Sequence, residues 1–133
     1  MRRDAREAVF SLLFKDLFNE ETDLNFKKKI YSEFKLNEAD SAFADLLYNA
    51  VKENEETLLE SIETLSKGFK LNRIFNTDKC ALLIGMCEMT YFPEVPKIVA
   101  IDEAVAISKK YSTEKSQQFI NGILAEYKKR LEA

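Results

Sequence analysis

The feature that most constrains the fold lies near the C-terminus, where two apolar stripes of helical period follow each other closely. Ile98, Ile101 and Val105 recur at helical spacing after Pro96, whose fixed φ suits the entry to a helix. A polar break at residues 112–114 ends this segment. A second stripe then has the same period: Phe119, Ile120, Ile123, Leu124, Tyr127 and Leu131. Two amphipathic helices this close in sequence should pack against each other.

The rest of the chain favours the same kind of structure. Its 133 residues include only three glycines and two prolines, and 46% of them are hydrophobic. Such a composition is typical of an all-helical protein. A chain of this length can bury roughly two thirds of its unfolded surface. It therefore needs no metal or disulfide to fold.

The apolar periodicity predicts about seven helices, counting the C-terminal pair. The five earlier ones are expected at residues 4–19, 25–34, 38–54, 55–66 and 76–91. Asn25 and Asn37 are the expected N-caps of the second and third helices. The helix of residues 76–91 is apolar nearly all round, so it should be the central one. We predict an all-α single domain over residues 1–133, made of two small packed bundles at about 1–54 and 55–133.

Several classes of function are excluded by what the sequence lacks. It has no histidine, no glycine-rich phosphate loop and only two cysteines, so catalytic triads, cofactor loops and zinc sites have no basis. Asp102 and Glu103 are adjacent, and neighbours on a helix point about 100° apart, which is poor geometry for a catalytic pair. No apolar run is long enough to span a membrane, and no signal peptide begins the chain, so we expect a cytoplasmic protein that is not an enzyme.

Charge is distributed unevenly along the chain. The net charge is −3 overall, but residues 1–18 carry +1, residues 19–66 carry −7 and residues 67–133 carry +3. An acidic middle is therefore flanked by two basic ends. A nucleic acid, if one binds, should avoid the middle.

The first predicted helix opens with an arginine cluster. Arg2, Arg3 and Arg6 project over a common arc that continues along the helix toward Phe14. One interpretation is a solvated cluster. The other is a grip on phosphates beside a ring for base stacking, which single-stranded RNA binding requires. The residues alone leave both open.

Asn121 and Gly122 form an unusual pair, because the apolar period of the last helix passes straight through them. Glycine inside a helix costs up to about 1 kcal/mol relative to alanine, so something should require the small residue. Either a neighbouring helix packs closely there, or an RNA backbone approaches and Asn121 hydrogen-bonds it.

Three separated blocks of the sequence resemble one family. The first is Arg-Arg-Asp-Ala-Arg-Glu-Ala at residues 2–8. The second is Phe69-x-Leu71-x-Arg73-Ile74, followed by Asp-Lys and Glu-Met. The third is Val-Pro-x-x-Val-Ala-Ile-Asp-Glu-Ala-Val together with Phe-Ile-Asn-Gly-Ile-Leu. In this order and spacing they are similar to the NusB family of bacterial transcription antitermination factors. The resemblance covers nearly the whole chain.

That resemblance implies a role in recognition. NusB proteins pair with NusE, a small-subunit ribosomal protein, and hold the boxA sequence of nascent single-stranded RNA so that RNA polymerase reads through terminators in ribosomal RNA operons. Carried over by position, the RNA-binding residues would be Arg2, Arg3, Arg6, Phe14, Lys115, Gln118, Phe119 and Asn121. Glu88 would lie where the RNA and NusE contacts meet, as a partner-binding residue.

Two alternatives remain. The chain also resembles the RNA-targeting helical domain fused to ribosomal RNA cytosine methyltransferases, in which case a methyltransferase domain would have to lie beyond Ala133. A helical adaptor or homodimer without an RNA role is the other alternative. It predicts that the arginines of residues 2–6 can be replaced by alanine without loss of binding.

Overall fold

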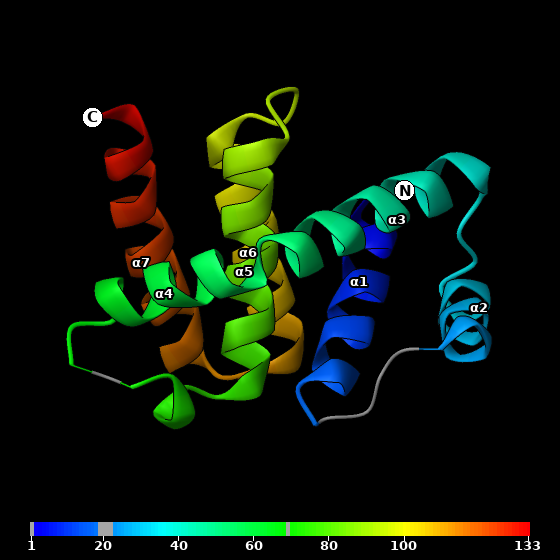
Figure 1. The fold of residues 1–133 in the computed structure, drawn as a ribbon, viewed down its shortest axis with the longest axis horizontal. Helices are drawn as coiled ribbons and strands as arrows, with labels where there is room; N and C mark the ends of the chain where they lie inside the picture. Colours follow the sequence, from blue (N-terminus) through cyan, green and yellow to red (C-terminus); the bar gives the residue numbers. More distant parts are fainter. Residues whose placement is uncertain (1, 19–22, 69) are drawn as a thin grey trace.

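The computed structural model describes residues 2–18, 23–68 and 70–133. This part of the chain contains seven α-helices and one short 3-10 helix, and no strand (Figure 1). In chain order they are α1 (Arg2–Asp16), α2 (Leu24–Glu33), α3 (Glu38–Glu53), α4 (Glu55–Leu65), η1 (Leu71–Arg73), α5 (Asn76–Tyr91), α6 (Lys97–Tyr111) and α7 (Glu114–Glu132). The all-α prediction is confirmed.

Side-chain caps fix where three of these helices begin. The Asn37 side chain accepts the backbone N–H of Asp40 at 2.8 Å, as predicted for α3. For α2 the predicted cap, Asn25, is wrong. Asp23 accepts the N–H of Phe26 at 2.7 Å and starts the helix earlier. A side-chain oxygen of this kind satisfies one of the N–H groups that a helix start leaves unpaired.

Helix α5 is the centre of the molecule, as its all-round apolar sequence predicts. It contacts α1, α3, α4, α6 and α7. In Figure 1, α1 to α3 lie on one side of α5, and α4 and α7 lie on the other. Buried side chains from all of these helices except α2 form one continuous hydrophobic cluster. The two groups of helices therefore share a core around α5.

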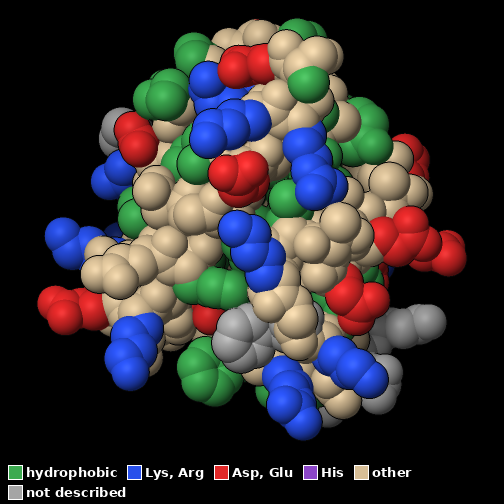
Figure 2. All heavy atoms as spheres, turned by 90° about the vertical axis from the view of Figure 1, so that its left-hand side faces the viewer, with side chains coloured by type: hydrophobic (Ala, Val, Ile, Leu, Met, Phe, Trp, Pro, Cys, Tyr) green, Lys and Arg blue, Asp and Glu red, His purple; other side chains and the backbone are tan. Residues whose placement is uncertain are grey.

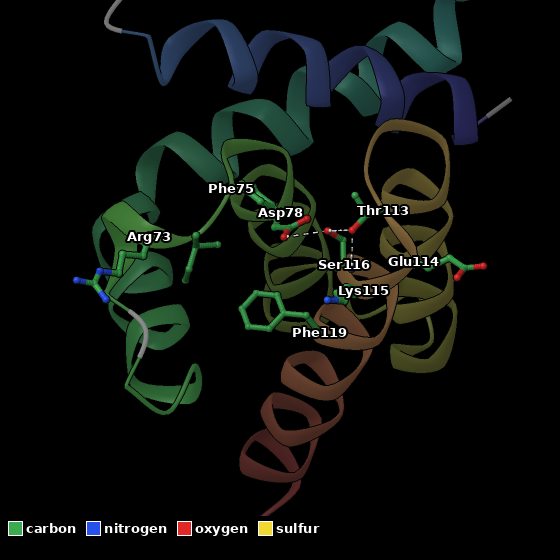
Figure 3. A pocket seen from close by; sticks show the side chains of 9 residues that line it. Arg73, Phe75, Asp78, Thr113, Glu114, Lys115, Ser116 and Phe119 are labelled. Atoms are coloured by element: carbon green, nitrogen blue, oxygen red, sulfur yellow. Dashed lines mark hydrogen bonds between the residues drawn. The ribbon is translucent and has the colours of Figure 1, made fainter.

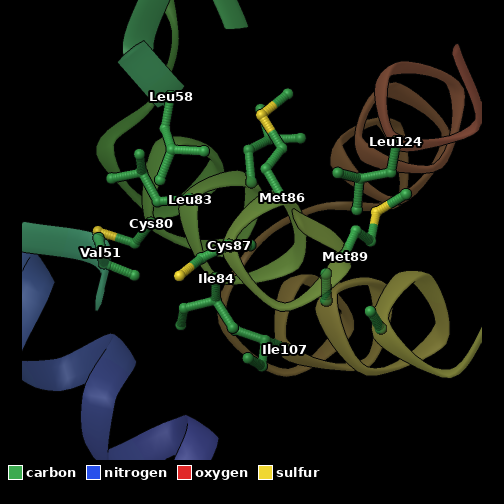
Figure 4. Packing of buried hydrophobic residues seen from close by; sticks show 14 of the residues in the cluster. Val51, Leu58, Cys80, Leu83, Ile84, Met86, Cys87, Met89, Ile107 and Leu124 are labelled. Carbon is green, nitrogen blue, oxygen red and sulfur yellow. The ribbon is translucent and has the colours of Figure 1, made fainter. Parts of the chain in front are cut away.

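The core is closely packed against α5 where it carries Gly85. A Cβ at this position would lie 2.8 Å from Cδ1 of Leu124 on α7 and 3.1 Å from Cβ of Ala104 on α6. Figure 4 shows α5 side chains surrounded by residues from neighbouring helices, including Leu58 of α4 and Ile107 of α6. The absence of a side chain at Gly85 lets both helices of the C-terminal pair approach α5 closely.

The predicted core stripe of α6 is partly wrong. Ile98 is 58% exposed and Val105 only half-buried, whereas Ala100 and Ala104 are completely buried. The close approach of α6 to Gly85 selects these small residues for the contact, and the larger Ile98 is turned outward. On α7 the end of the stripe is also wrong, because Leu131 is exposed.

Other differences concern helix ends and the loop before α5. Helix α1 ends at Asp16, earlier than predicted, and the rest of its predicted C-terminal turn reaches residue 19, outside the described residues. In the loop before α5, Phe75 is exposed and Ile74 is buried. Phe69, the first residue of the second sequence block, lies outside the described residues.

Candidate nucleic-acid interface

The first two arginines of α1 lie at the surface but are not free of partners. The Arg2 guanidinium carbon lies 4.3 Å from the centroid of the Phe43 ring, within cation–π range. Arg3 donates from Nε to Glu103 Oε2 at 2.9 Å and from Nη2 to Oε1 at 3.2 Å. Its side chain is still 60% exposed. A phosphate could reach Arg3, in competition with Glu103.

The structure contradicts the predicted surface roles of Arg6 and Glu88. Arg6 donates to the two Glu88 carboxylate oxygens at 2.8 and 2.7 Å. The Arg6 side chain is 5% exposed and that of Glu88 not at all. A buried charge must be paired, and this pair is bidentate. Arg6 therefore attaches α1 to α5 and cannot grip phosphate from there, and Glu88 presents no surface to a protein partner.

Aromatic rings form a continuous row along α1 that ends on α6. The Phe10 ring stacks on Tyr111 with centroids 4.9 Å apart, and on Phe14 with centroids 6.1 Å apart. Phe14 then meets Phe18 edge-on at 5.1 Å. Phe10 is buried, Phe14 is half-buried, and Tyr111 and Phe18 are exposed. Phe14, Phe18 and Tyr111 leave ring surface that a base could reach, and of these rings the sequence had pointed only to Phe14.

Glu7 holds the α6 end of this row in place. Its Oε1 accepts the Tyr111 hydroxyl at 2.7 Å and the Lys110 ammonium at 2.8 Å. Burial and the Glu7 carboxylate raise the pKa of Tyr111 above its ordinary value. The phenol therefore stays protonated at neutral pH, and its ring is fixed beside an exposed lysine.

A polar network ties the next turn of chain to α5. Asp78 accepts the hydroxyls of Ser112 at 3.2 Å and Ser116 at 3.1 Å. The Thr113 side chain caps α7 by accepting the Ser116 N–H at 3.2 Å. Burial raises the pKa of Asp78 above the usual value, and the two serine hydroxyls limit that rise. The network fixes the start of α7, at Glu114, only three residues beyond Tyr111.

A largely apolar pocket of about 760 Å³ opens beside the start of α7. Figure 3 shows the Phe119 ring pointing into the space between α7 and η1, while Arg73 extends outward on the far side and Glu114 points away. The pocket is lined by Arg73, Ile74, Phe75, Asp78, Thr113, Glu114, Lys115, Ser116 and Phe119. Two predicted residues, Lys115 and Phe119, are thus brought together here.

The other predicted α7 residues lie on the exposed surface outside the pocket lining. Gln118 and Asn121 are exposed, one turn apart along the helix. Gly122 is exposed too, and a Cβ there would meet nothing within 4 Å. Among the described residues no helix packs closely against Gly122, so packing between them does not explain the glycine.

Basic side chains accompany this end of the molecule. Figure 2 views the side formed by α4 and α7, where lysine and arginine side chains are spread over the face among acidic ones, and some of them lie at its lower end near hydrophobic side chains. The lower end corresponds in Figure 1 to η1 and the first turns of α5 and α7. Cations beside apolar surface are the two components that single-stranded nucleic-acid sites combine.

Sequence reasoning missed four residues of this surface: Lys110, Tyr111, Arg73 and Phe75. Lys110 and Tyr111 end the predicted helix that follows Pro96, but no local pattern shows that the tyrosine ring stacks on Phe10. Arg73 and Phe75 lie in or next to η1, in the segment before α5. The feature of the sequence that could have placed Arg73 and Phe75 at this surface was their position immediately before the predicted start of α5.

Other kinds of site have little support in the described part of the chain. No group of three or more metal-ligating side chains is found among the described residues. None of the helices there is both long and apolar enough to cross a membrane.

Comparison with known proteins places these features in a family. The model of the NusB family matches residues 3–129. Transcription antitermination protein NusB of Finegoldia magna is 35% identical over 132 residues, which are 98% of this chain and 96% of the relative. Among solved structures, T. maritima NusB has a TM-score of 0.85 at 31% identity, covering 97% of this chain and 91% of that one.

A third comparison concerns the fold alone. The structure of antitermination factors NusB and NusE in complex with dsRNA contains a chain with a TM-score of 0.85 and 24% identity, covering 97% of this chain and 96% of that one. The family model spans nearly the whole chain and the curated relative matches it end to end. The chain therefore belongs to the NusB family.

Proposed function

We propose that this protein is a transcription antitermination factor that binds boxA-type single-stranded RNA together with NusE and supports read-through of ribosomal RNA operons by RNA polymerase. Family membership supports the antitermination role. The solved complex of NusB and NusE with dsRNA supports NusE and RNA as the two partners. The function is recognition without catalysis.

The observation that carries the RNA part is the continuity of one mixed surface. The aromatic row of α1 ends on Tyr111, and the chain passes from there through the Asp78 network into the pocket with Lys115 and Phe119. Bases have faces to stack and phosphates to neutralise, and this surface offers both rings and cations. A single strand laid along it would contact α1 first and α7 last.

Exposed groups at both ends would act on the backbone. Arg3 and Lys115 are placed to neutralise phosphates, and Asn121 to donate a hydrogen bond. The open surface at Gly122 lets a sugar-phosphate backbone approach the helix closely, which favours the RNA interpretation of the glycine over the packing one. Arg6 contributes indirectly, because its pair with Glu88 holds α1 against α5.

The test is fluorescence anisotropy of a labelled boxA RNA, titrated with this protein alone and with NusE, beside a scrambled RNA of the same composition. We expect selective binding that strengthens with NusE. With about three to five phosphates neutralised, log Kd should change with log salt with a slope of magnitude about 2 to 4. A slope near zero would contradict the phosphate contacts, and equal binding of the scrambled RNA would contradict boxA recognition.

A further inference from the structure

A second hollow lies on a different part of the surface from the proposed RNA-binding surface of α1, Tyr111 and α7. It is a groove of about 500 Å³ between the C-terminal half of α3 and the end of α5. It is lined by Leu46, Asn49, Ala50, Glu53, Tyr91, Phe92 and Glu94. None of these residues lines the pocket that contains Lys115 and Phe119.

The groove exposes apolar surface that the fold does not use. Leu46 is 64% exposed and Tyr91 is 42% exposed. Ala50 follows Leu46 by one helical turn, so both lie on the same face of α3. Phe92 is buried and packs edge-on against Phe43, which makes the floor rigid. A single exposed leucine is ordinary, but here it stands over a groove with an aromatic ring beside it.

The charge around this apolar surface has one sign. The lining includes Glu53 and Glu94 and no lysine or arginine. Helices α3 and α4 together carry eight carboxylates and one lysine, Lys52. That lysine already bridges Asp16 at 3.4 Å and Glu55 at 2.9 Å. Within the part of the chain that the structure describes, neither Glu53 nor Glu94 has a cationic partner.

We infer that this groove binds a basic protein segment, which inserts a large apolar side chain between Leu46 and Tyr91 and sets lysine or arginine beside Glu53 and Glu94. The carboxylates disfavour RNA here, because they repel phosphate. The Asn49 amide can both donate to and accept from the backbone of the segment. The protein would then hold RNA on one surface and a basic protein on another, and this second contact does not depend on the first.

The experiment follows amide resonances of the isotope-labelled full chain during titration with an acetylated, amidated peptide Lys-Lys-Leu-Phe-Lys-Lys. A matched peptide replaces the Leu-Phe pair by Ser-Ser. We expect shifts confined to the C-terminal half of α3 and the end of α5, with the apolar peptide and not the serine peptide. Added salt should weaken the binding, because the rim contacts are ionic.

Variants then separate the two components of the groove. Leu46→Ser should lower the affinity for the peptide about tenfold. Leu24→Ser, at a leucine that is 61% exposed on α2, should leave that affinity unchanged. Glu53→Gln with Glu94→Gln should weaken it about threefold to tenfold at low salt. Glu56→Gln with Glu60→Gln, two exposed carboxylates of α4, is the matched control.

The inference is overturned by shifts that map elsewhere, by no shift at millimolar peptide, or by equal affinity for the serine peptide. It is also overturned if Leu46→Ser binds as the unchanged chain does. Two further outcomes identify another occupant. An oligouridine RNA that shifts the same amides would assign the groove to nucleic acid. Sedimentation equilibrium showing a dimer that Leu46→Ser dissociates would assign it to a second copy.

Discussion

The two ends of the proposed RNA-binding surface, one on α1 and one at the start of α7, look alike in the sequence and differ in the structure. At the α1 end, Arg6 is buried against Glu88, and Arg3 is held by Glu103. At the α7 end, Lys115 and Asn121 are exposed. Both ends place cations near aromatic residues, but at the α1 end the guanidinium groups of Arg3 and Arg6 are already paired with carboxylates.

The difference shows that the number of cationic residues in a segment does not tell how many of them can bind a phosphate. The three arginines of residues 2–6 share an arc in sequence, but α1 packs into a core that already contains a carboxylate from α5. The arginine that faces inward must pair with it, because an unpaired buried charge is very costly. Arg6 is therefore part of the scaffold, and we propose that the RNA contacts lie instead at Arg3, Tyr111 and the start of α7.

The largest expected effect follows from removing one partner of the buried pair. Arg6→Ala leaves the fully buried Glu88 carboxylate without its partner, which should lower the free energy of unfolding by about 3 to 5 kcal/mol. Urea unfolding at pH 7 measures it. Arg2→Ala, which removes only a surface cation–π contact, is the control and should cost about 1 kcal/mol or less. Equal losses of unfolding free energy in the two variants would contradict the distinction between the buried arginine and the surface one.

A second prediction compares the two helical glycines, beginning with the packed one. Gly85→Ala would place a methyl group 2.8 Å from Leu124 Cδ1 and 3.1 Å from Ala104 Cβ. Overpacking of this kind costs about 1 to 3 kcal/mol, partly relieved if Leu124 changes rotamer. Thermal unfolding measures it. An increase in melting temperature would show that α6 and α7 do not pack as closely as described.

The exposed glycine should behave in the opposite way. Gly122→Ala meets nothing within 4 Å, so it should stabilise the protein by up to about 1 kcal/mol through helix propensity. The same variant should bind boxA RNA more weakly, because a methyl group now stands where the backbone approaches. Unfolding and anisotropy are measured on one preparation. Unchanged RNA affinity would remove Gly122 from the interface.

The sequence predicted local features of the fold better than its long-range contacts. The Asn37 cap and the bounds of α5 follow from neighbouring residues, so they could be read directly. The Arg6–Glu88 pair joins positions 82 residues apart, and no local pattern specifies it. The buried face of α6 was misassigned for a related reason. The size of Ala104 matters only because Gly85 lies opposite.

The candidate site divides in the same way. Lys115 and Phe119 share one helical face, so their proximity was predictable from spacing. The stacking of Tyr111 on Phe10 depends on how α6 crosses α1, which the sequence does not encode locally. Residue type therefore indicated RNA binding, whereas the tertiary packing decided which side chains can take part.

The smallest expected effect concerns pH and the network under the α7 end. Burial raises the pKa of Asp78, so the folded state holds its proton more tightly than the unfolded chain. That contribution to stability is present below the ordinary aspartate pKa of about 4 and is lost as pH rises through the raised folded value. Stability of the unchanged chain relative to Asp78→Asn should therefore fall as pH rises above about 4. A relative stability that rises with pH would mean that the serine hydroxyls outweigh burial.

The most direct test of the central claim compares RNA binding by two folded variants. One replaces the buried pair by apolar residues, Arg6→Met with Glu88→Leu, a change that often leaves stability nearly unaltered. The other removes exposed α7 side chains: Lys115→Ala, Gln118→Ala and Asn121→Ala. Anisotropy with boxA RNA and NusE should give an affinity within about threefold of the unchanged chain for the first, and a loss of about tenfold or more for the second. The reverse order would contradict the account, because it would place Arg6 in the interface and α7 outside it.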